Sequence, residues 1–142
     1  MQIEIATRAT EELWDAFQGL VPQLTSNNPP PSRDDLAALV KSESSTLIIA
    51  RADNSSIIGA ACVTVYRVPT GIRAIIEDVI VAESARGLGI GEALVQRCLD
   101  IARGKGAKGV SLTSNPKREA ANKLYQKMGF RKRETNAYYF KF

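Results

Sequence analysis

The segment from Ala85 to Gln96, ARGLGIGEALVQ, contains the residue types that could most directly bind a ligand. Its glycines stand at positions 87, 89 and 91, directly before an amphipathic run that is typical of a helix. Glycine leaves the backbone amides unobstructed, and the first turn of a helix offers N–H groups that have no partner within the helix. This combination predicts an anion site, and most such sites bind phosphate groups.

The glycine segment does not fit the two most familiar phosphate-binding motifs. A G-x-G-x-x-G motif counted from Gly87 meets Glu92 at its last position, and counted from Gly89 it meets Leu94. The chain also lacks the G-x-x-x-x-G-K sequence of a P-loop. Hairpin-linked strands precede the glycines where a βαβ unit should stand, so a dinucleotide-binding fold is excluded as well.

Glu77 and Asp78 are adjacent carboxylates in a largely apolar run, residues 72–82, that predicts a strand covered on both faces. Apolar surroundings raise the pKa of a carboxyl group, and such a carboxylate can act as a general base. Because strand side chains alternate, the two should point to opposite faces, and only one should reach a substrate. The alternative is that both pair with basic groups and only hold the sheet together.

The composition narrows the possible chemistry. The chain has no histidine, and its two cysteines, Cys62 and Cys98, lack metal-ligand spacing. Catalytic triads built on histidine and histidine-based metal sites are therefore excluded, and we expect both cysteines to be small buried residues and no metal to bind. The net charge of +4 suits an anionic ligand. Nucleic acid is not favoured, because the few aromatic residues are not interleaved with the basic run.

These residues must be positioned by one domain, residues 1–142, since this length with 44% hydrophobic residues suits a single core. QIEIAT predicts a strand, Thr10 a helix start, and Ser32 with Asp35 a capping box for a second, short helix. Three β-rich runs, residues 46–52, 57–68 and 72–82, are separated by DNSS and PTG and predict an antiparallel meander.

The part beyond the glycines predicts two helices and two strands. A helical pattern runs up to RGKGAKG, VSLTS predicts a short strand, and Asn115 with Pro116 predicts the start of a second helix. Gly129 with Phe130 fits the end of that helix, and ETNAYYFKF predicts a last strand. No apolar run is long enough to span a membrane and the N-terminus does not read as a signal peptide, so we expect a cytoplasmic protein.

The spacing that does fit is Arg86-x-x-Gly89-x-Gly91, which resembles the pyrophosphate-binding motif of the GCN5-related N-acetyltransferases, the GNAT superfamily. AANKLYQKMGF, residues 120–130, resembles that family's second motif, in which a tyrosine stands four residues before a Gly-Phe pair. The order of the predicted elements is also similar over the whole chain. The resemblance implies an α/β (α+β) fold with a mixed, mostly antiparallel sheet of about six or seven strands and about four helices.

The resemblance implies acetyl-CoA as the acyl donor, with its pyrophosphate on the glycine loop and its pantetheine arm beside the strand edge at Val79 to Val81. Many family members carry an asparagine seven residues before the tyrosine, but Arg118 stands there in this chain. Which nearby asparagine contacts the donor therefore stays open. The implied donor-binding residues are Val79, Ile80, Val81, Arg86, Gly87, Leu88, Gly89, Ile90, Gly91, Asn115 and Asn122.

By the same resemblance, Tyr125 protonates the departing CoA thiolate, and the alternative is a tyrosine that only packs in the core. Glu77 is the candidate base that takes the proton of the amine, directly or through a water. IIEDVIV is similar to the corresponding strand of glucosamine-6-phosphate acetyltransferases, which favours Glu77 over Asp78.

The sequence thus predicts acetyl transfer from acetyl-CoA to the primary amine of a small molecule, by direct attack of the amine on the thioester. The alternatives are transfer to a protein N-terminus or a lysine, and an acetyl-CoA-binding module without catalysis. A small amine suits a closed pocket under the loop that contains Pro29 to Pro31, whereas a peptide needs an open groove. A homodimer through the last strands is a further expectation from the resemblance.

Overall fold

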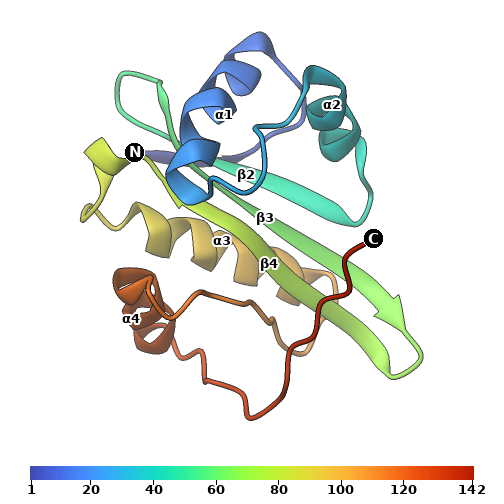
Figure 1. Ribbon diagram of the computed structural model, residues 1–142. Coiled ribbons are helices and arrows are strands. Elements are labelled where there is room, and N and C mark those ends of the chain that lie inside the picture. The colour runs from blue at the N-terminus through green and yellow to red at the C-terminus, as the bar shows by residue number, and fades with distance from the viewer.

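The three β-rich runs form consecutive strands of one antiparallel sheet. They are β2 (Ser45–Arg51), β3 (Ile57–Val68) and β4 (Gly71–Val81), and β1 (Gln2–Ile5) pairs with the outer edge of β2. The strand order is therefore β1-β2-β3-β4, as the meander predicted. The computed structural model describes residues 1–142, and Figure 1 shows the sheet crossing the middle of the molecule with helices on either side.

The helices α1 (Glu11–Leu24) and α2 (Arg33–Lys41) cover one face of the sheet. The side chain of Thr10 accepts a hydrogen bond from the Leu13 amide at the start of α1. Ser32 and Asp35 form the capping box predicted for α2, each side chain accepting from the other residue's amide. The apolar sides of the two helices then pack on β2 and β3 through Leu13, Phe17, Leu36, Leu47, Ile49 and Ala60.

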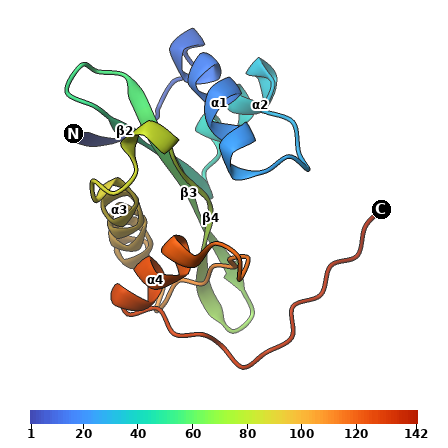
Figure 2. The same ribbon diagram turned by 60° about the vertical axis from the view of Figure 1, so that its left-hand side comes forward.

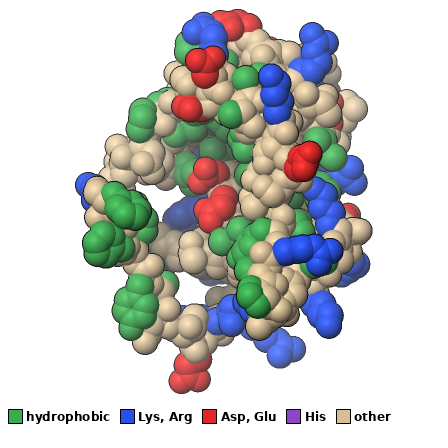
Figure 3. Space-filling model, turned by 90° about the vertical axis from the view of Figure 1, so that its right-hand side faces the viewer, with side chains coloured by type: hydrophobic (Ala, Val, Ile, Leu, Met, Phe, Trp, Pro, Cys, Tyr) green, Lys and Arg blue, Asp and Glu red, His purple; other side chains and the backbone are tan.

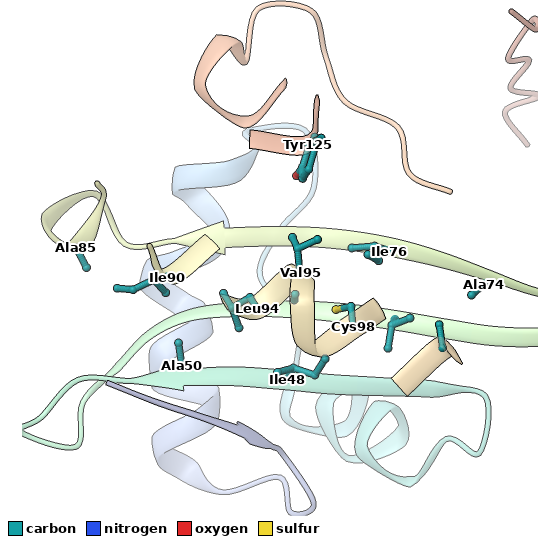
Figure 4. Packing of buried hydrophobic residues seen from close by; sticks show 13 residues of the cluster. Ile48, Ala50, Ala74, Ile76, Ala85, Ile90, Leu94, Val95, Cys98 and Tyr125 are labelled. Carbon is teal, nitrogen blue, oxygen red and sulfur yellow. The ribbon is translucent and has the colours of Figure 1, made fainter. Parts of the chain in front are cut away.

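The helix α3 (Ile90–Gly104) covers the opposite face and carries the larger core. Its buried residues Leu94, Val95 and Cys98 pack against strand residues such as Ile48 and Ile76 (Figure 4). Cys98 is a fully buried free thiol, as expected, whereas Cys62 on β3 is free but only half-buried. The two helical layers hold β4 between them, and this fixes the strand that carries both carboxylates.

The last helix, α4 (Glu119–Lys127), lies next to α3 (Figure 2), and Lys127 pairs with Glu92 in the first turn of α3 at 2.9 Å. Gly129 follows the end of α4 and has φ of +100°, and the Phe130 amide donates to the Tyr125 carbonyl at 2.9 Å. The rings of Tyr125 and Phe130 meet edge to face at 5.7 Å. The turn predicted at Gly129-Phe130 is therefore confirmed, and it fixes the end of α4 that carries Tyr125.

Four helices and an antiparallel sheet confirm the predicted fold class, but the sheet has four strands, not six or seven. In VSLTS only Ser111 pairs with β4: it accepts from Ile76 at 2.9 Å and donates to Ala74 at 3.0 Å. The predicted last strand is also wrong. The tail pairs with no strand, and its aromatic residues are 81–111% exposed. Its β-prone sequence finds no sheet edge or core face, and strand propensity depends on such packing.

The predicted start of α4 was three residues too early. The carboxamide of Asn115 accepts from the Lys117 amide at 2.9 Å and forms a local turn instead of a helix cap. The helix begins after Arg118, which provides no side-chain cap. Asn-Pro suits a turn as well as a helix start, and here the turn is formed. None of the helices is long and apolar enough to cross a membrane.

Candidate active site

The glycine loop connects β4 to α3 and begins with a short 3-10 turn, η1 (Glu83–Ala85). Gly87 and Gly89 both have φ of +80°, a left-handed conformation that favours glycine. A Cβ atom at either position would have no heavy atom within 4 Å, so the space beside this backbone is open. Gly89 is also the N-cap of α3, where no side chain binds the first amides of the helix. The loop therefore presents free backbone amides to a ligand.

Gly91 has a different role from the other two glycines. A Cβ atom there would lie 3.3 Å from Cδ2 of Leu124 and 3.7 Å from Cγ2 of Val81. The small residue thus lets α3 approach β4 and α4 closely. The three glycines therefore have two different roles. Gly87 and Gly89 allow the left-handed backbone conformation, and Gly91 allows close packing.

β4 contains a β-bulge at the centre of the site. Cys62 of β3 lies opposite Glu77, but Ala60 lies opposite Ile80, so one residue of β3 faces two residues of β4. Asp78, inside the bulge, has φ of +51°. A bulge takes its extra residue out of the ladder and bends the strand. The Val79 carbonyl accepts instead from Nη2 of Arg118, at 3.4 Å. The backbone at Asp78 and Val79 is therefore free of regular strand pairing.

We predicted that the Glu77 and Asp78 side chains point to opposite faces because side chains alternate along a regular strand. The bulge interrupts that alternation at these two residues. Both side chains are exposed, and neither has an ion pair, because every salt bridge of the protein involves other acidic residues. Although Glu77 is exposed as a whole, neighbouring atoms remove part of its carboxyl group from water, and this effect and then the negative charge of Asp78 raise its pKa. Figure 3 shows acidic side chains next to one another at the centre of a hollow. Two uncompensated carboxylates beside a bulge suit proton transfer better than a purely structural role.

A pocket of about 570 Å³ joins the end of β4, the glycine loop and α4. Its volume is within the range of small-molecule sites. It brings together most of the residues predicted to bind the donor, with Tyr125 on the opposite wall: Val79, Ile80, Val81, Arg86, Gly87, Gly89, Ile90 and Gly91.

Four predicted residues are not part of the pocket lining. Leu88 is 72% exposed, and Asn122 lines a second hollow behind α4. Asn115 forms the turn before α4, and its carbonyl accepts from the Asn122 side chain at 3.0 Å. Glu77 lies on β4 two residues before Val79, outside the lining. Arg118, at the position where relatives often have asparagine, does line the pocket.

Gln23 and Leu24 at the end of α1 line the pocket and were not predicted from the sequence. The side-chain oxygen of Gln23 accepts from the Glu83 amide at 2.7 Å, which ties α1 to η1. No motif could have revealed this contact, because the two residues are 60 positions apart. The contact shows that the loop after α1, residues 25–32, starts at the wall of the pocket.

Tyr125 is 6% exposed and extends from α4 toward β4 (Figure 4). Burial raises the pKa of its phenol, and the positive charge of Arg118 opposes that shift. The phenol is therefore protonated at neutral pH, which a proton donor requires. Tyr125 also packs in the core against Phe130. It is therefore both a core residue and a residue of the pocket lining.

The sequence profile of the Acetyltransferase (GNAT) family matches residues 7–130. A curated relative, the glucosamine 6-phosphate N-acetyltransferase of Trypanosoma brucei brucei, is 36% identical over 92 residues. The match covers 63% of this chain and 60% of the relative, so it spans less than two thirds of that enzyme's length.

Solved structures show the same architecture over almost the whole chain. An acetyltransferase of Trypanosoma brucei matches with a TM-score of 0.77 and 27% identity, covering 98% of both chains. An aminoglycoside acetyltransferase from an uncultured soil metagenomic sample, solved in complex with sisomicin, matches with a TM-score of 0.84. Its identity is 17%, over 99% of this chain and 95% of that chain, so it supports the fold alone. Because the family profile covers most of the chain, this protein belongs to the GNAT family of acetyltransferases.

Proposed function

We propose that the protein transfers the acetyl group of acetyl-CoA to the primary amine of a small molecule by direct attack. The observation that carries this proposal is the pocket that joins the glycine loop, the β4 bulge and Tyr125. Family membership makes the protein an acyltransferase, and acetyl-CoA is the donor of the family. The acceptor and the roles of single residues are our assignments.

The backbone around the pocket fits acetyl-CoA. The amides of residues 87–91 and the uncapped start of α3 can hold the pyrophosphate. Arg86, whose Nε donates to the Val81 carbonyl at 3.3 Å, adds positive charge at the same place. The edge of β4 at Val79 to Val81 can pair with the amides of the pantetheine arm. A bulge amide can face the thioester oxygen and stabilise the charge that develops there. The bound donor supplies the acetyl group as an activated thioester.

Asn122 and Asn115 support the site in our assignment without touching the donor. The side chain of Asn122 donates to the carbonyls of Asn115, at 3.0 Å, and Arg118, at 2.8 Å. These bonds fix the turn before α4. We therefore assign to Arg118 the place that the asparagine of many relatives would take.

Proton transfer at the donor end is assigned to Tyr125. When the amine nitrogen bonds to the carbonyl carbon, it becomes positively charged and releases a second proton to solvent, while the C–S bond breaks and its electron pair goes to sulfur. The buried phenol of Tyr125 gives its proton to that sulfur and recovers one from solvent after the product leaves.

Proton transfer at the acceptor end is assigned to Glu77. A free alkylamine is almost wholly protonated at pH 7 and must lose a proton before it attacks. Glu77 lies outside the pocket lining, which supports a water between its carboxylate and the amine. Its raised pKa brings this carboxylate closer to the working pH of a general base.

A small amine is our first choice of acceptor because the curated relative, by its name, acts on glucosamine 6-phosphate. The loop at residues 25–32 leaves the pocket wall at Leu24 and is placed to restrict a large acceptor. Transfer to a protein N-terminus or lysine is the second candidate. The homodimer and the cytoplasmic location stay predictions. The residues expected to form the dimer, 134–142, pair with no strand of their own chain.

The test is a turnover screen that follows the release of free CoA. The panel contains amino sugars with and without a phosphate, polyamines, amino acids, and peptides with a free N-terminus or a lysine. Turnover on a small amine supports the proposal. Turnover on peptides alone would mean that the acceptor is a protein N-terminus or a lysine and not a small amine. Tight acetyl-CoA binding with no turnover on any amine would favour the non-catalytic module.

A further inference from the structure

Arg118 lies where three parts of the active site meet. It is the residue before α4, it lines the pocket, and its Nη2 donates to the Val79 carbonyl in the β4 bulge at 3.4 Å. It is also only half-buried, so its charge is partly removed from water. No other basic side chain of the protein donates to the β4 bulge.

The backbone of Arg118 is fixed from both sides. Its amide donates to the Asn115 carbonyl at 3.0 Å, and its carbonyl accepts from the Asn122 side chain at 2.8 Å. With φ of −82° and ψ of 69°, the residue lies outside the helix that follows it. These contacts aim the side chain across the pocket toward β4, and the guanidinium keeps this position without an ion pair to any carboxylate.

The charged groups around Tyr125 come from α4, α3, the glycine loop and β4, where Glu77 and Asp78 are exposed and lie outside the pocket lining. Arg118 and Glu119 lie at the start of α4, Glu92 lies on α3, and Arg86 lies in the glycine loop. Glu92 is compensated by Lys127 at 2.9 Å. The hollow behind α4 adds the basic residues Lys123, Arg131, Lys132 and Arg133. Among all of these, only Arg118 shifts the pKa of the Tyr125 phenol, and it lowers it, while burial and the Cys98 thiol raise it.

We propose that Arg118 is a positioning residue for the acid step: its guanidinium, fixed on the Val79 carbonyl of the bulge, keeps a positive charge in the pocket that Tyr125 also lines and so prepares the phenol to protonate the departing sulfur. This inference rests on the proposed function. The guanidinium keeps its charge throughout. It acts through the phenol: the fixed positive charge favours release of the Tyr125 proton, and Tyr125 delivers that proton to sulfur as the C–S bond breaks. An asparagine at this position could donate the hydrogen bond to β4 but could not supply the charge.

The first test compares Arg118→Met, Arg118→Asn and Arg118→Lys with the wild type over a range of pH. Tyr125 acts as an acid only while it is protonated, so kcat falls as pH rises through its pKa. Without the nearby cation that pKa rises, and the alkaline limb of kcat moves to higher pH. We expect Arg118→Met and Arg118→Asn to lower kcat on the order of 10- to 100-fold at neutral pH and to move the limb. Arg118→Lys keeps a positive charge, so it should show a smaller fall in kcat and a smaller movement of the alkaline limb than Arg118→Met.

The matched control is Arg97→Met, which removes a charge from the exposed side of α3, away from the pocket. It should leave kcat and its pH profile unchanged. A drop in kcat for Arg118→Met with an unmoved alkaline limb would overturn the proposal, because a merely structural loss has no reason to act through the phenol.

A double-mutant cycle with Tyr125→Phe gives the second test. If Arg118 acts through Tyr125, adding Arg118→Met to Tyr125→Phe should change kcat by less than about threefold. If the double variant loses as much kcat as the two single losses multiplied together, the two residues act independently and the proposal is contradicted.

A third readout does not depend on turnover. Ultraviolet titration, with Tyr125→Phe used to identify the signal of this phenol, should show a higher pKa for Tyr125 in Arg118→Met than in the wild type. An unchanged titration would overturn the link between the two residues even if acetyl transfer occurs. If the pKa of Tyr125 is higher in Arg118→Met than in the wild type but the wild type turns over no amine, the link between the two residues stands and the proposed function is rejected instead.

Discussion

The proposed donor side of the pocket is formed by backbone, whereas the proposed acceptor side is formed by side chains. On the donor side, Gly87 and Gly89 adopt a left-handed conformation, and the bulge frees the backbone of Asp78 and Val79 from the sheet. On the proposed acceptor side stand the carboxylates of Glu77, our candidate base, and Asp78, and neither has an ionic partner. Backbone conformation restricts the residue type, so the donor side leaves a motif in the sequence. A solvent-facing carboxylate is less restricted, and Glu77 was singled out only by its apolar neighbours in the strand and by resemblance.

The two sides also differ in what they contribute to stability. The donor loop is joined to the core through Ile90, which is 3% exposed, and through the bond between Gln23 and Glu83. The acceptor carboxylates repel each other, and burial further raises the pKa of Glu77. Unfavourable charge placement of this kind is typical of functional sites. The variants below separate the two sides.

The largest effect is expected for Gly89→Glu on the donor side. The added carboxylate would repel the pyrophosphate, and we expect acetyl-CoA to bind about 100-fold more weakly or not at all, as measured by calorimetry. The substitution also strains a residue with positive φ, by about 1–2 kcal/mol. Gly71→Glu controls for the strain, because Gly71 has φ of +134°, open space around it, and a place outside the pocket. Equal affinity of the two variants would reject the assignment of the loop.

Tyr125→Phe removes one hydroxyl at the donor end and keeps the ring that packs against Phe130. We expect kcat and kcat/KM to fall together by about 100-fold, because the proton is transferred only in the transition state. The KM for acetyl-CoA should change little. Single-turnover rates on the folded variant exclude product release as the limiting step. Unchanged single-turnover chemistry would mean that Tyr125 is a packing residue and that water protonates the thiolate.

Glu77→Gln tests the acceptor side. The loss in kcat should reach about 100-fold near neutral pH and should shrink as pH rises, because more of the amine is then already unprotonated. In the wild type, Glu77 must lose its own proton to act, so kcat falls as pH drops through its raised pKa. The affinity for acetyl-CoA should be unchanged. A loss that is the same at every pH would assign Glu77 to structure or to acceptor binding.

Asp78→Asn should have the smallest effect. Asparagine tolerates the positive φ of this position, so the bulge is retained. Removing the neighbouring negative charge lowers the pKa of Glu77, and the acid limb of kcat should move to lower pH. A pH–rate profile on the same acceptor measures this shift. If the limb moves to higher pH instead, the limb does not report Glu77.

The sequence predicted the elements that are defined by local patterns. The hairpins between β2, β3 and β4 follow from turn residues between β-rich runs, and the start of α2 follows from its capping box. The segments at 110–114 and 134–142 were predicted to be strands for the same kind of reason. In both, the local pattern is insufficient, because a strand needs a partner edge and a face to pack on. Ser111 alone reaches β4, and the tail reaches no strand.

The candidate site was predictable where the backbone restricts the residue type. The glycines and Tyr125 are found from their spacing, and the structure brings them into one pocket. The bulge at Asp78 could not be predicted, because an aspartate with positive φ in an apolar strand has no sequence signal. Gln23 and Arg118 enter the site through contacts with residues 60 and 39 positions away along the chain. Such contacts depend on the folded chain and not on a motif.

Direct transfer from donor to amine is tested most directly by the intact mass of the protein after incubation with acetyl-CoA alone. Cys62, a free thiol on β3 that lies opposite Glu77, is the candidate acceptor for an acetyl-enzyme intermediate. Burial and the charge of Asp78 raise the pKa of its thiol, which leaves little thiolate at neutral pH. Direct transfer predicts an unmodified protein and, once the amine is added, acetyl on the amine only. A protein that becomes one acetyl group heavier and then passes that group to the amine would contradict it.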